Sequence, residues 1–262
     1  MDVTDADLIV GTSSGSTAAA QLTGGARPAE LYAAVVAESP HPQAGAGPDR
    51  GRTPRLAGAS AMEWSGAVIA ASADAADMRR RMGAAALEAD ASNGADGRRW
   101  RDIVAKRLAG LVWPERAVLI TAVDARTGES VVFDRSSGVD LVDAVAASTS
   151  ARTPYPVGEN RYLNGGYRRN ENADLAAGYG RVLVLSPFSG RSRMPHGWGM
   201  DLATQVAELR AAGSRVETVF PDAGAGDVFN ANALDPSIRQ QAARGGYEQG
   251  RALATVVGEL WR

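Results

Sequence analysis

The hydrophobic positions of this chain form short apolar runs and longer segments in which an apolar residue recurs every three or four positions. The apolar runs predict strands at Asp7–Val10, Ala117–Val123, Ser130–Phe133, Arg181–Ser186 and Arg215–Phe220. The longer segments predict helices at Ser13–Leu22, Ser60–Ala71, Ala75–Ala89, Arg98–Leu111, Val139–Ala147, Leu202–Ala212 and Pro236–Trp261. Because nearly continuous apolar strands alternate with helices, we expect a layered α/β domain around a mostly parallel sheet.

The order of these segments favours a single domain over residues 1–262, without an internal repeat. Residues 38–58 are rich in glycine and proline, which predicts a mobile surface loop. Residues 60–111 contain helical patterns and no convincing strand. We therefore expect them to form a helical flank or cap beside the sheet.

The composition of the 262 residues, 45% hydrophobic and 22% charged, is ordinary for a globular protein. A net charge of −2 without a long basic run gives no reason to expect a nucleic-acid partner. The absence of cysteine excludes disulfides and thiol catalysis, and two histidines, His41 and His196, are too few for a typical metal cluster. We expect no cofactor and no metal, and with no membrane-spanning stretch or signal peptide visible we expect a cytoplasmic protein.

The clearest chemical motif is the sequence GTSSG at residues 11–15, which lies between a predicted strand and a predicted helix. This Gly-x-Ser-x-Gly pattern is the signature of a nucleophile elbow, a sharp turn that holds a reactive serine, here Ser13. We expect side chains at Gly11 or Gly15 to clash in such a turn. Two alternatives remain, namely that Ser13 and Ser14 cap the helix or that the turn binds a phosphate, although no Walker lysine follows.

A nucleophilic serine requires a general base. The α/β-hydrolase arrangement fits poorly, because at most one strand precedes Ser13. His196, in the loop SRMPHGWGMD, is a weak candidate for the base, and His41 is a weaker one because it lies in the predicted mobile loop. Both histidines are more simply explained as solvated loop residues.

Four segments follow one another in the order GTSSGS, TAVDARTGESVVF, VAAST and RYLNGGYRRNENADLAAGYGRVLVLSP. Together they resemble the patatin-like phospholipases from about residue 5 to residue 190. The resemblance implies a layered α/β/α sandwich with a mostly parallel central sheet. It also implies a serine hydrolase that uses a Ser–Asp dyad without histidine. The family's serine corresponds to Ser13, its elbow glycines to Gly11 and Gly15, and its aspartate to Asn164.

Two departures from the family bear on activity. Asn164 precedes Gly165 and Gly166 as the family's aspartate would, but a carboxamide has no basic lone pair at neutral pH to accept the serine proton. The family also carries a glycine-rich oxyanion loop upstream of its serine, whereas only twelve residues precede Ser13. We therefore expect the N-terminal strand and helix to be missing, as in a fragment or a chain assigned a late start. The backbone N–H of Ser14 is the remaining oxyanion donor.

These observations predict a hydrolase of lipid or carboxylester acyl groups in which Ser13 attacks the ester carbonyl and Asn164 orients the serine. Such a substrate allows transient contact with a membrane surface. The alternatives are a catalytically inactive relative that binds lipid and an anion-binding α/β module. We expect Asp174 to cap or flank a helix, and Arg168 and Arg169 to be surface charges or to bind a lipid phosphate.

Overall fold

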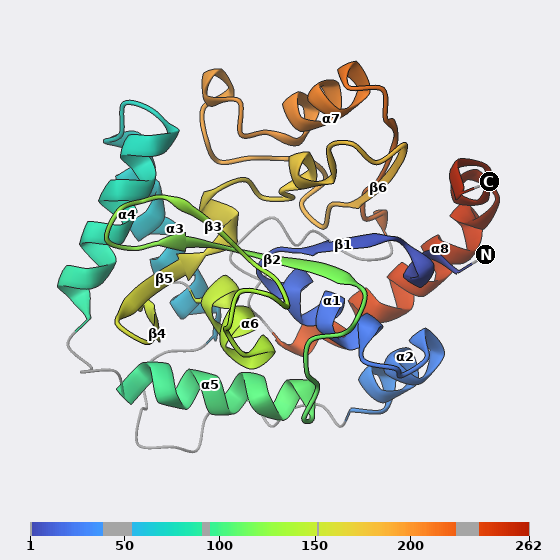
Figure 1. The fold of residues 1–262 in the computed structure, drawn as a ribbon, viewed down its shortest axis with the longest axis horizontal. Helices are drawn as coiled ribbons and strands as arrows, with labels where there is room; N and C mark the ends of the chain where they lie inside the picture. Colours follow the sequence, from blue (N-terminus) through green and yellow to red (C-terminus); the bar gives the residue numbers. More distant parts are fainter. Residues whose placement is uncertain (1, 39–53, 91–94, 151, 224–235, 262) are drawn as a thin grey trace.

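A computed structural model describes residues 2–38, 54–90, 95–150, 152–223 and 236–261, and these form a mixed α/β structure (Figure 1). The helices are α1 (Ser14–Thr23), α2 (Pro28–Ala37), α3 (Pro54–Ala70), α4 (Ala75–Ala89), α5 (Ala95–Leu108), α6 (Leu141–Thr149), α7 (Leu202–Ala211) and α8 (Arg239–Trp261). The strands are β1 (Leu8–Gly11), β2 (Ala117–Asp124), β3 (Ser130–Phe133), β4 (Tyr155–Val157), β5 (Asn160–Asn164), β6 (Arg181–Leu185) and β7 (Arg215–Val219). Short 3₁₀ turns lie at Val3–Asp5, Gly165–Tyr167 (η2), Ala173–Ala176 (η3), His196–Trp198 and Pro236–Ile238.

The described strands form two sheets, and the larger one is mixed rather than mostly parallel. Strand β1 is parallel to β2, whereas β2 is antiparallel to both β3 and β5, and β4 is antiparallel to β5. Strands β6 and β7 form a separate parallel pair. The short connections β2–β3 and β4–β5 explain the difference, because a parallel pairing requires a crossover of a dozen or more residues.

Strands β1 and β5 lie one after the other along the same edge of β2. Ile120 pairs with both Gly11 and Phe133, so β1 and β3 occupy opposite edges of β2. Ala122 likewise pairs with both Asn164 of β5 and Val131 of β3, so β5 and β3 also occupy opposite edges of β2. Because β1 runs parallel and β5 antiparallel to β2, their carboxyl ends meet beside Thr121.

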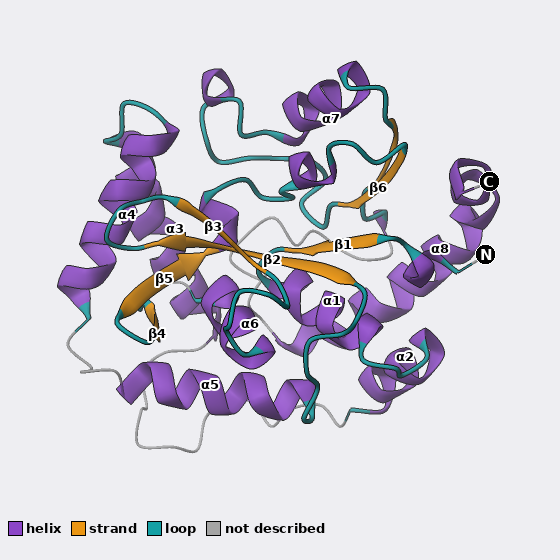
Figure 2. Cartoon of the chain, viewed as in Figure 1, coloured by secondary structure: helices purple, strands orange, loops and turns teal. Residues whose placement is uncertain are grey.

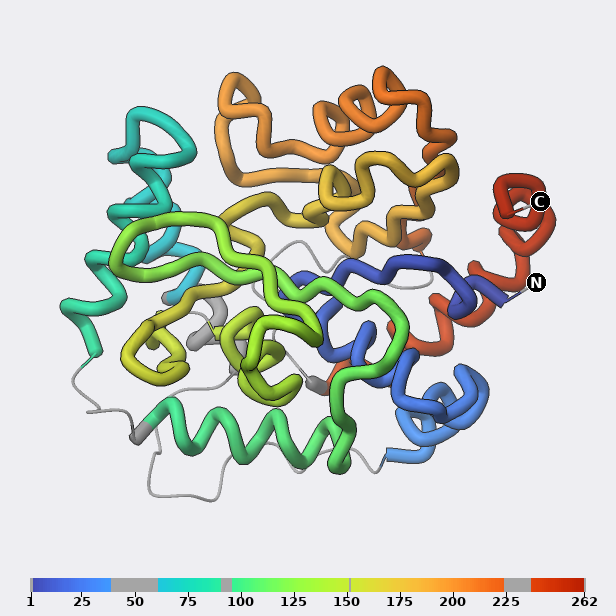
Figure 3. Tube along the Cα trace, viewed as in Figure 1, coloured from blue at the N-terminus to red at the C-terminus, as the bar shows by residue number. Residues whose placement is uncertain are grey.

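Helices cover both faces of this sheet, and Figure 2 shows them around the crossing strands. Helices α1, α5 and α6 pack on one face, where the side chains of Val118, Ile120 and Ala122 enter the main core. Helices α3 and α4 pack against a second apolar cluster that contains Val123 and Leu163. A third cluster joins α7 to β6 and β7. The Cα trace in Figure 3 shows the segment that enters α1 at the centre of the molecule, beside β2.

The structure contains elements that the sequence pattern did not predict. Helix α2 begins with Pro28 in its first turn, and the backbone N–H of the N-cap residue Arg27 donates to the carboxylate of Glu30 at 3.1 Å. The hairpin β4–β5 turns at Gly158, whose φ of 58° is a conformation that glycine adopts easily. Helix α3 begins at Pro54, so the end of the predicted loop 38–58 is helical, while residues 39–53 lie outside the described part.

Candidate active site

The strand-to-helix turn holds Ser13 in an unusual backbone conformation. Its φ of 53° and ψ of −126° are strained for a residue with a side chain, at a typical cost of about 1–3 kcal/mol. Ser13 occupies the N-cap position of α1, yet its side chain makes no capping hydrogen bond. The side chain of Ser13 therefore does not cap the helix, and its hydroxyl is available for another contact.

The two elbow glycines differ in their surroundings. A Cβ atom at Gly11 would lie 2.6 Å from the Cα of Ser16, which is closer than real side chains approach. A Cβ at Gly15 would meet nothing within 4 Å. The expected clash is therefore confirmed for Gly11 and wrong for Gly15, because the first turn of α1 leads away from β1 at that point.

Asn164 contacts Ser13 directly, as the resemblance predicts. The backbone N–H of Gly166 donates to Oδ1 of Asn164 at 2.9 Å, and because an N–H only donates, this bond fixes the orientation of the amide. Nδ2 of Asn164 then donates to Oγ of Ser13 at 2.9 Å. The hydrogen bond therefore points toward the serine oxygen, in the direction opposite to that of a general base.

Gly165 and Gly166 hold Asn164 in this position. A Cβ at Gly165 would lie 2.1 Å from Oγ1 of Thr121, so only glycine permits this close approach of the two strands. The N–H of Gly166 is already engaged by Asn164, so in this arrangement it does not serve as an oxyanion donor. Both residues support the turn rather than the oxyanion.

Ser148 was not identified from the sequence as part of this site. The backbone N–H of Ser13 donates to its Oγ at 2.9 Å, and Ser148 is fully buried in α6. This bond holds the strained turn against the helix. The segment VAAST contains Ser148, but the two residues are 135 positions apart, so only the packing of α6 on the sheet reveals their contact.

The N-terminus of α1 leaves Ser14 exposed beside the serine hydroxyl. Within the described chain, the backbone N–H of Ser14 donates to no protein acceptor. Helix N-termini carry unpaired N–H groups and a partial positive charge, which favours an anion. Ser14 is therefore the N–H group of the elbow that is available to a developing oxyanion.

Arg168 and Arg169 are not simple surface charges. Arg168 forms a two-pronged ion pair with Asp174, at 2.6 and 3.0 Å, and Arg169 pairs with Glu208 at 2.6 Å. Burial alone would raise the pKa of Asp174, but the hydrogen bond and charge of Arg168, with a smaller effect of Arg169, lower it. These side chains brace the loop that follows Asn164, and Asp174 is engaged as an ion-pair partner in the first turn of η3.

The histidines lie apart from the serine turn or outside the described residues. His196 is 96% exposed, and its nearest acidic partner is Asp201, with Nδ1 and Oδ2 3.8 Å apart. Within the described chain it has no contact with Ser13, whose hydroxyl instead meets Asn164. His41 lies outside the described residues. The geometry thus gives His196 no role as the base.

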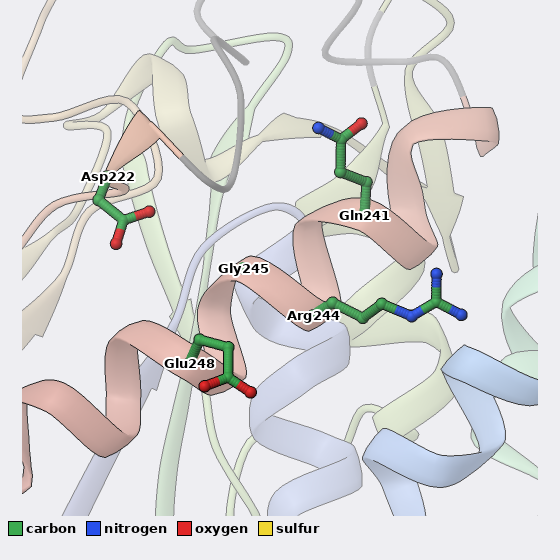
Figure 4. Close-up of a pocket in the computed structure, with 5 residues that line it drawn as sticks. All are labelled: Asp222, Gln241, Arg244, Gly245 and Glu248. Atoms are coloured by element: carbon green, nitrogen blue, oxygen red, sulfur yellow. The ribbon is translucent and has the colours of Figure 1, made fainter.

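A separate cavity of about 350 Å³ lies along α8 (Figure 4). It is lined by Asp222, Gln241, Arg244, Gly245 and Glu248. None of these residues belongs to the serine turn. Among the described helices, none is long and apolar enough to cross a membrane.

Comparisons with known proteins do not place the chain in a family: no protein-family model and no curated protein matches it. The structure itself defines an α/β protein with a strained serine turn whose hydroxyl contacts an asparagine from a neighbouring strand. Any function therefore has to be argued from this site.

Proposed function

We propose that this chain carries a serine acyl-hydrolase site of the patatin-like type, with Ser13 as the nucleophile and residue 164 as its partner. Its substrates would be lipid or carboxylester acyl groups. The observation that carries this proposal is the strained Ser13 with its hydroxyl 2.9 Å from the side chain of Asn164. Strained backbone of this kind is concentrated at functional sites, and no capping bond of the Ser13 side chain explains it here.

The proposed chemistry depends on an acceptor at position 164. A carboxylate there would take the Ser13 hydroxyl proton as Oγ attacks the ester carbonyl carbon, giving a tetrahedral intermediate. Collapse would expel the alcohol, which takes up that proton and leaves an acyl-serine. Water would then attack the acyl carbon, release the acid and restore the serine. Asn164 cannot accept the proton, so the chain as it stands should have weak esterase activity or none.

Stabilisation of the oxyanion would come from the N-terminus of α1, where the N–H of Ser14 is unpaired within the described chain. A patatin-like site adds donors from a glycine-rich loop that follows a further strand. Strands β1 and β6 each pair on one edge only among the described strands.

A catalytically inactive relative that binds lipid is the second candidate. The observation that favours it is the direction of the Asn164 hydrogen bond, because Nδ2 donates to the serine instead of accepting from it. In this case the site would hold an ester without cleaving it.

Labelling with a fluorophosphonate probe tests the proposal, because the probe reacts with activated serines. We expect slow labelling of the natural chain, faster labelling of Asn164→Asp, and none when Ser13→Ala is added. A binding-only protein would give no Ser13-dependent labelling while Asn164 is present. Labelling that survives Ser13→Ala would exclude Ser13 as the nucleophile.

A further inference from the structure

A buried asparagine, Asn172, lies next to the Ser13–Asn164 pair and has no role in the mechanism above. It sits between η2 and η3, and its side chain is 0% exposed. Its backbone adopts the left-handed conformation, with φ of 53° and ψ of 34°, which asparagine tolerates better than most residues. A buried carboxamide in such a position needs polar partners on both of its ends.

The side chain of Asn172 meets both requirements. Oδ1 accepts from Nη1 of Arg168 at 2.6 Å, and arginine only donates, so this bond fixes the orientation of the amide. Nδ2 faces four oxygens, and its two protons are shared among them. These are Thr12 Oγ1 at 2.9 Å, Thr121 Oγ1 at 3.2 Å, the Gly165 carbonyl at 3.2 Å and the Arg169 carbonyl at 2.6 Å.

Three of these partners belong to the segments that present the reacting side chains. Thr12 directly precedes Ser13, and Gly165 directly follows Asn164. Thr121 lies on β2 at the point where the carboxyl ends of β1 and β5 meet, and its hydroxyl is also 3.1 Å from that of Thr12. One amide group thus ties together the two turns and the strand between them.

The anchor of Asn172 is itself rigid. The N–H of the next residue, Ala173, donates to Oε1 of Gln205 at 2.8 Å, and Gln205 is fully buried in α7. On the other side, Arg168 is held by its ion pair with Asp174. The amide is therefore fixed relative to the sheet by contacts that do not involve Ser13 or Asn164.

We propose that Asn172 is a positioning residue that sets the distance and angle between Ser13 and residue 164. This inference rests on the proposed function, because positioning matters for catalysis only if Ser13 is the nucleophile. A displacement of about 1 Å in a reacting group can lower a rate by about 10². Loss of the Asn172 amide removes the common donor to the Thr12 and Thr121 hydroxyls and the Gly165 carbonyl, which weakens the link between the two turns.

Asn172→Gly tests the contribution of the side chain without changing the backbone, because glycine keeps the left-handed conformation and removes only the amide. The matched control is Asn170→Gly in the same loop, whose amide donates to the carbonyl of Arg191 and to neither turn. Both changes are made in the Asn164→Asp protein, where a base is present, and thermal unfolding measures the cost to stability of each.

With a short-chain ester, Asn172→Gly should lower kcat by about 10- to 100-fold while KM changes little, because the amide contacts the turns and not the substrate. The rate constant of fluorophosphonate labelling should fall in parallel. Asn170→Gly should retain the parent kcat. Equal kcat and labelling in the two variants would overturn the positioning role. A fall in kcat that both variants show in proportion to their fall in unfolding temperature would overturn it too.

A second measurement on the natural chain does not depend on catalysis. Asn164–Gly165 is an Asn-Gly sequence, in which the backbone nitrogen of Gly165 attacks Cγ of Asn164 and expels ammonia. The resulting succinimide takes up water to give aspartate or isoaspartate. Asn172 donates to the Gly165 carbonyl, on the peptide that follows the attacking nitrogen, and so restrains the backbone on the C-terminal side of that nitrogen.

Peptide mass spectrometry after storage should therefore show faster conversion at residue 164 in Asn172→Gly than in Asn170→Gly. If Asn164→Asp fails to label at all, the proposed hydrolase function is wrong, and the conversion rate still decides the positioning role. Equal conversion in the two variants would show that Asn172 does not hold the turn.

Discussion

Replacing Asn164 by aspartate exchanges a single polar group at the centre of the site. The amide Nδ2 that donates to Oγ of Ser13 at 2.9 Å becomes an oxygen that accepts from it. The N–H of Gly166 holds the other oxygen in place at 2.9 Å in both forms. Because the two side chains have the same shape, the variant should keep the geometry and reverse the direction of the hydrogen bond.

The expected gain in labelling rate is the contribution of a general base to the rate. Such a base contributes about 10²–10⁴ in rate, which corresponds to about 3–5 kcal/mol of transition-state stabilisation. The variant should therefore react with a fluorophosphonate about 10²–10⁴ times faster than the natural chain.

The assay compares rate constants of labelling for the natural chain, Asn164→Asp and Asn164→Asp with Ser13→Ala. Asn160→Asp, on the exposed start of the same strand, controls for the added charge. The gain should appear as pH rises through the carboxyl pKa, since only the ionised form accepts a proton. A folded Asn164→Asp protein that labels no faster than Asn160→Asp would refute the dyad. Robust ester turnover by the natural chain, abolished by Ser13→Ala, would show that another base acts and would require a test of His196→Ala.

Three further changes probe the framework of the site. Gly11→Ala should destabilise the protein by about 1–3 kcal/mol in thermal or denaturant unfolding, because its Cβ would lie 2.6 Å from a backbone atom. The control Gly15→Ala should change the free energy of unfolding little, and equal losses in the two variants would contradict the elbow geometry. Ser148→Ala should cost about 1–3 kcal/mol and slow labelling, because the N–H of Ser13 loses its acceptor; unchanged labelling in a folded variant would argue against this. The ion pair with Arg168 holds the pKa of Asp174 below its ordinary value of 3.8, so its stabilisation is present above that value and is lost as pH falls through the folded pKa. Asp174→Asn should therefore show a smaller drop in unfolding temperature between pH 7 and pH 3, and an equal drop would contradict the ion pair.

Much of the fold follows from the hydrophobic pattern, because β1, β2, β3 and β6 are apolar runs bounded by polar residues, and β7 carries Val216 and Val219 at apolar positions. Strands β4 and β5 were missed because they are short and carry Pro156 and Arg161 within them. The turn at Gly158 was an available signal for that hairpin. The expected mostly parallel sheet is wrong for the larger sheet, and the five-residue connection between β2 and β3 already excluded a parallel pairing there.

The candidate site was predicted in part. Order along the chain and resemblance suggested that Ser13 and Asn164 meet, and their hydrogen bond confirms the proximity. The contacts of Ser148 and Asn172 could not be predicted, because they depend on which strand edges and helix faces come together. Serine and asparagine are common in loops and caps, so their residue type alone does not mark a buried partner of the site.

The framework of the site and its chemistry are separable in this protein. Gly11 permits the tight turn into α1, and Gly165 permits the close approach of the second turn to Thr121 of β2. Ser148 holds the first turn and the N–H of Gly166 holds Asn164, and none of these contacts involves Nδ2 of Asn164. Folding therefore preserves the arrangement whether residue 164 is an amide or a carboxylate. Because the same geometry serves both, a change of one atom should decide whether the serine is only hydrogen-bonded or also activated.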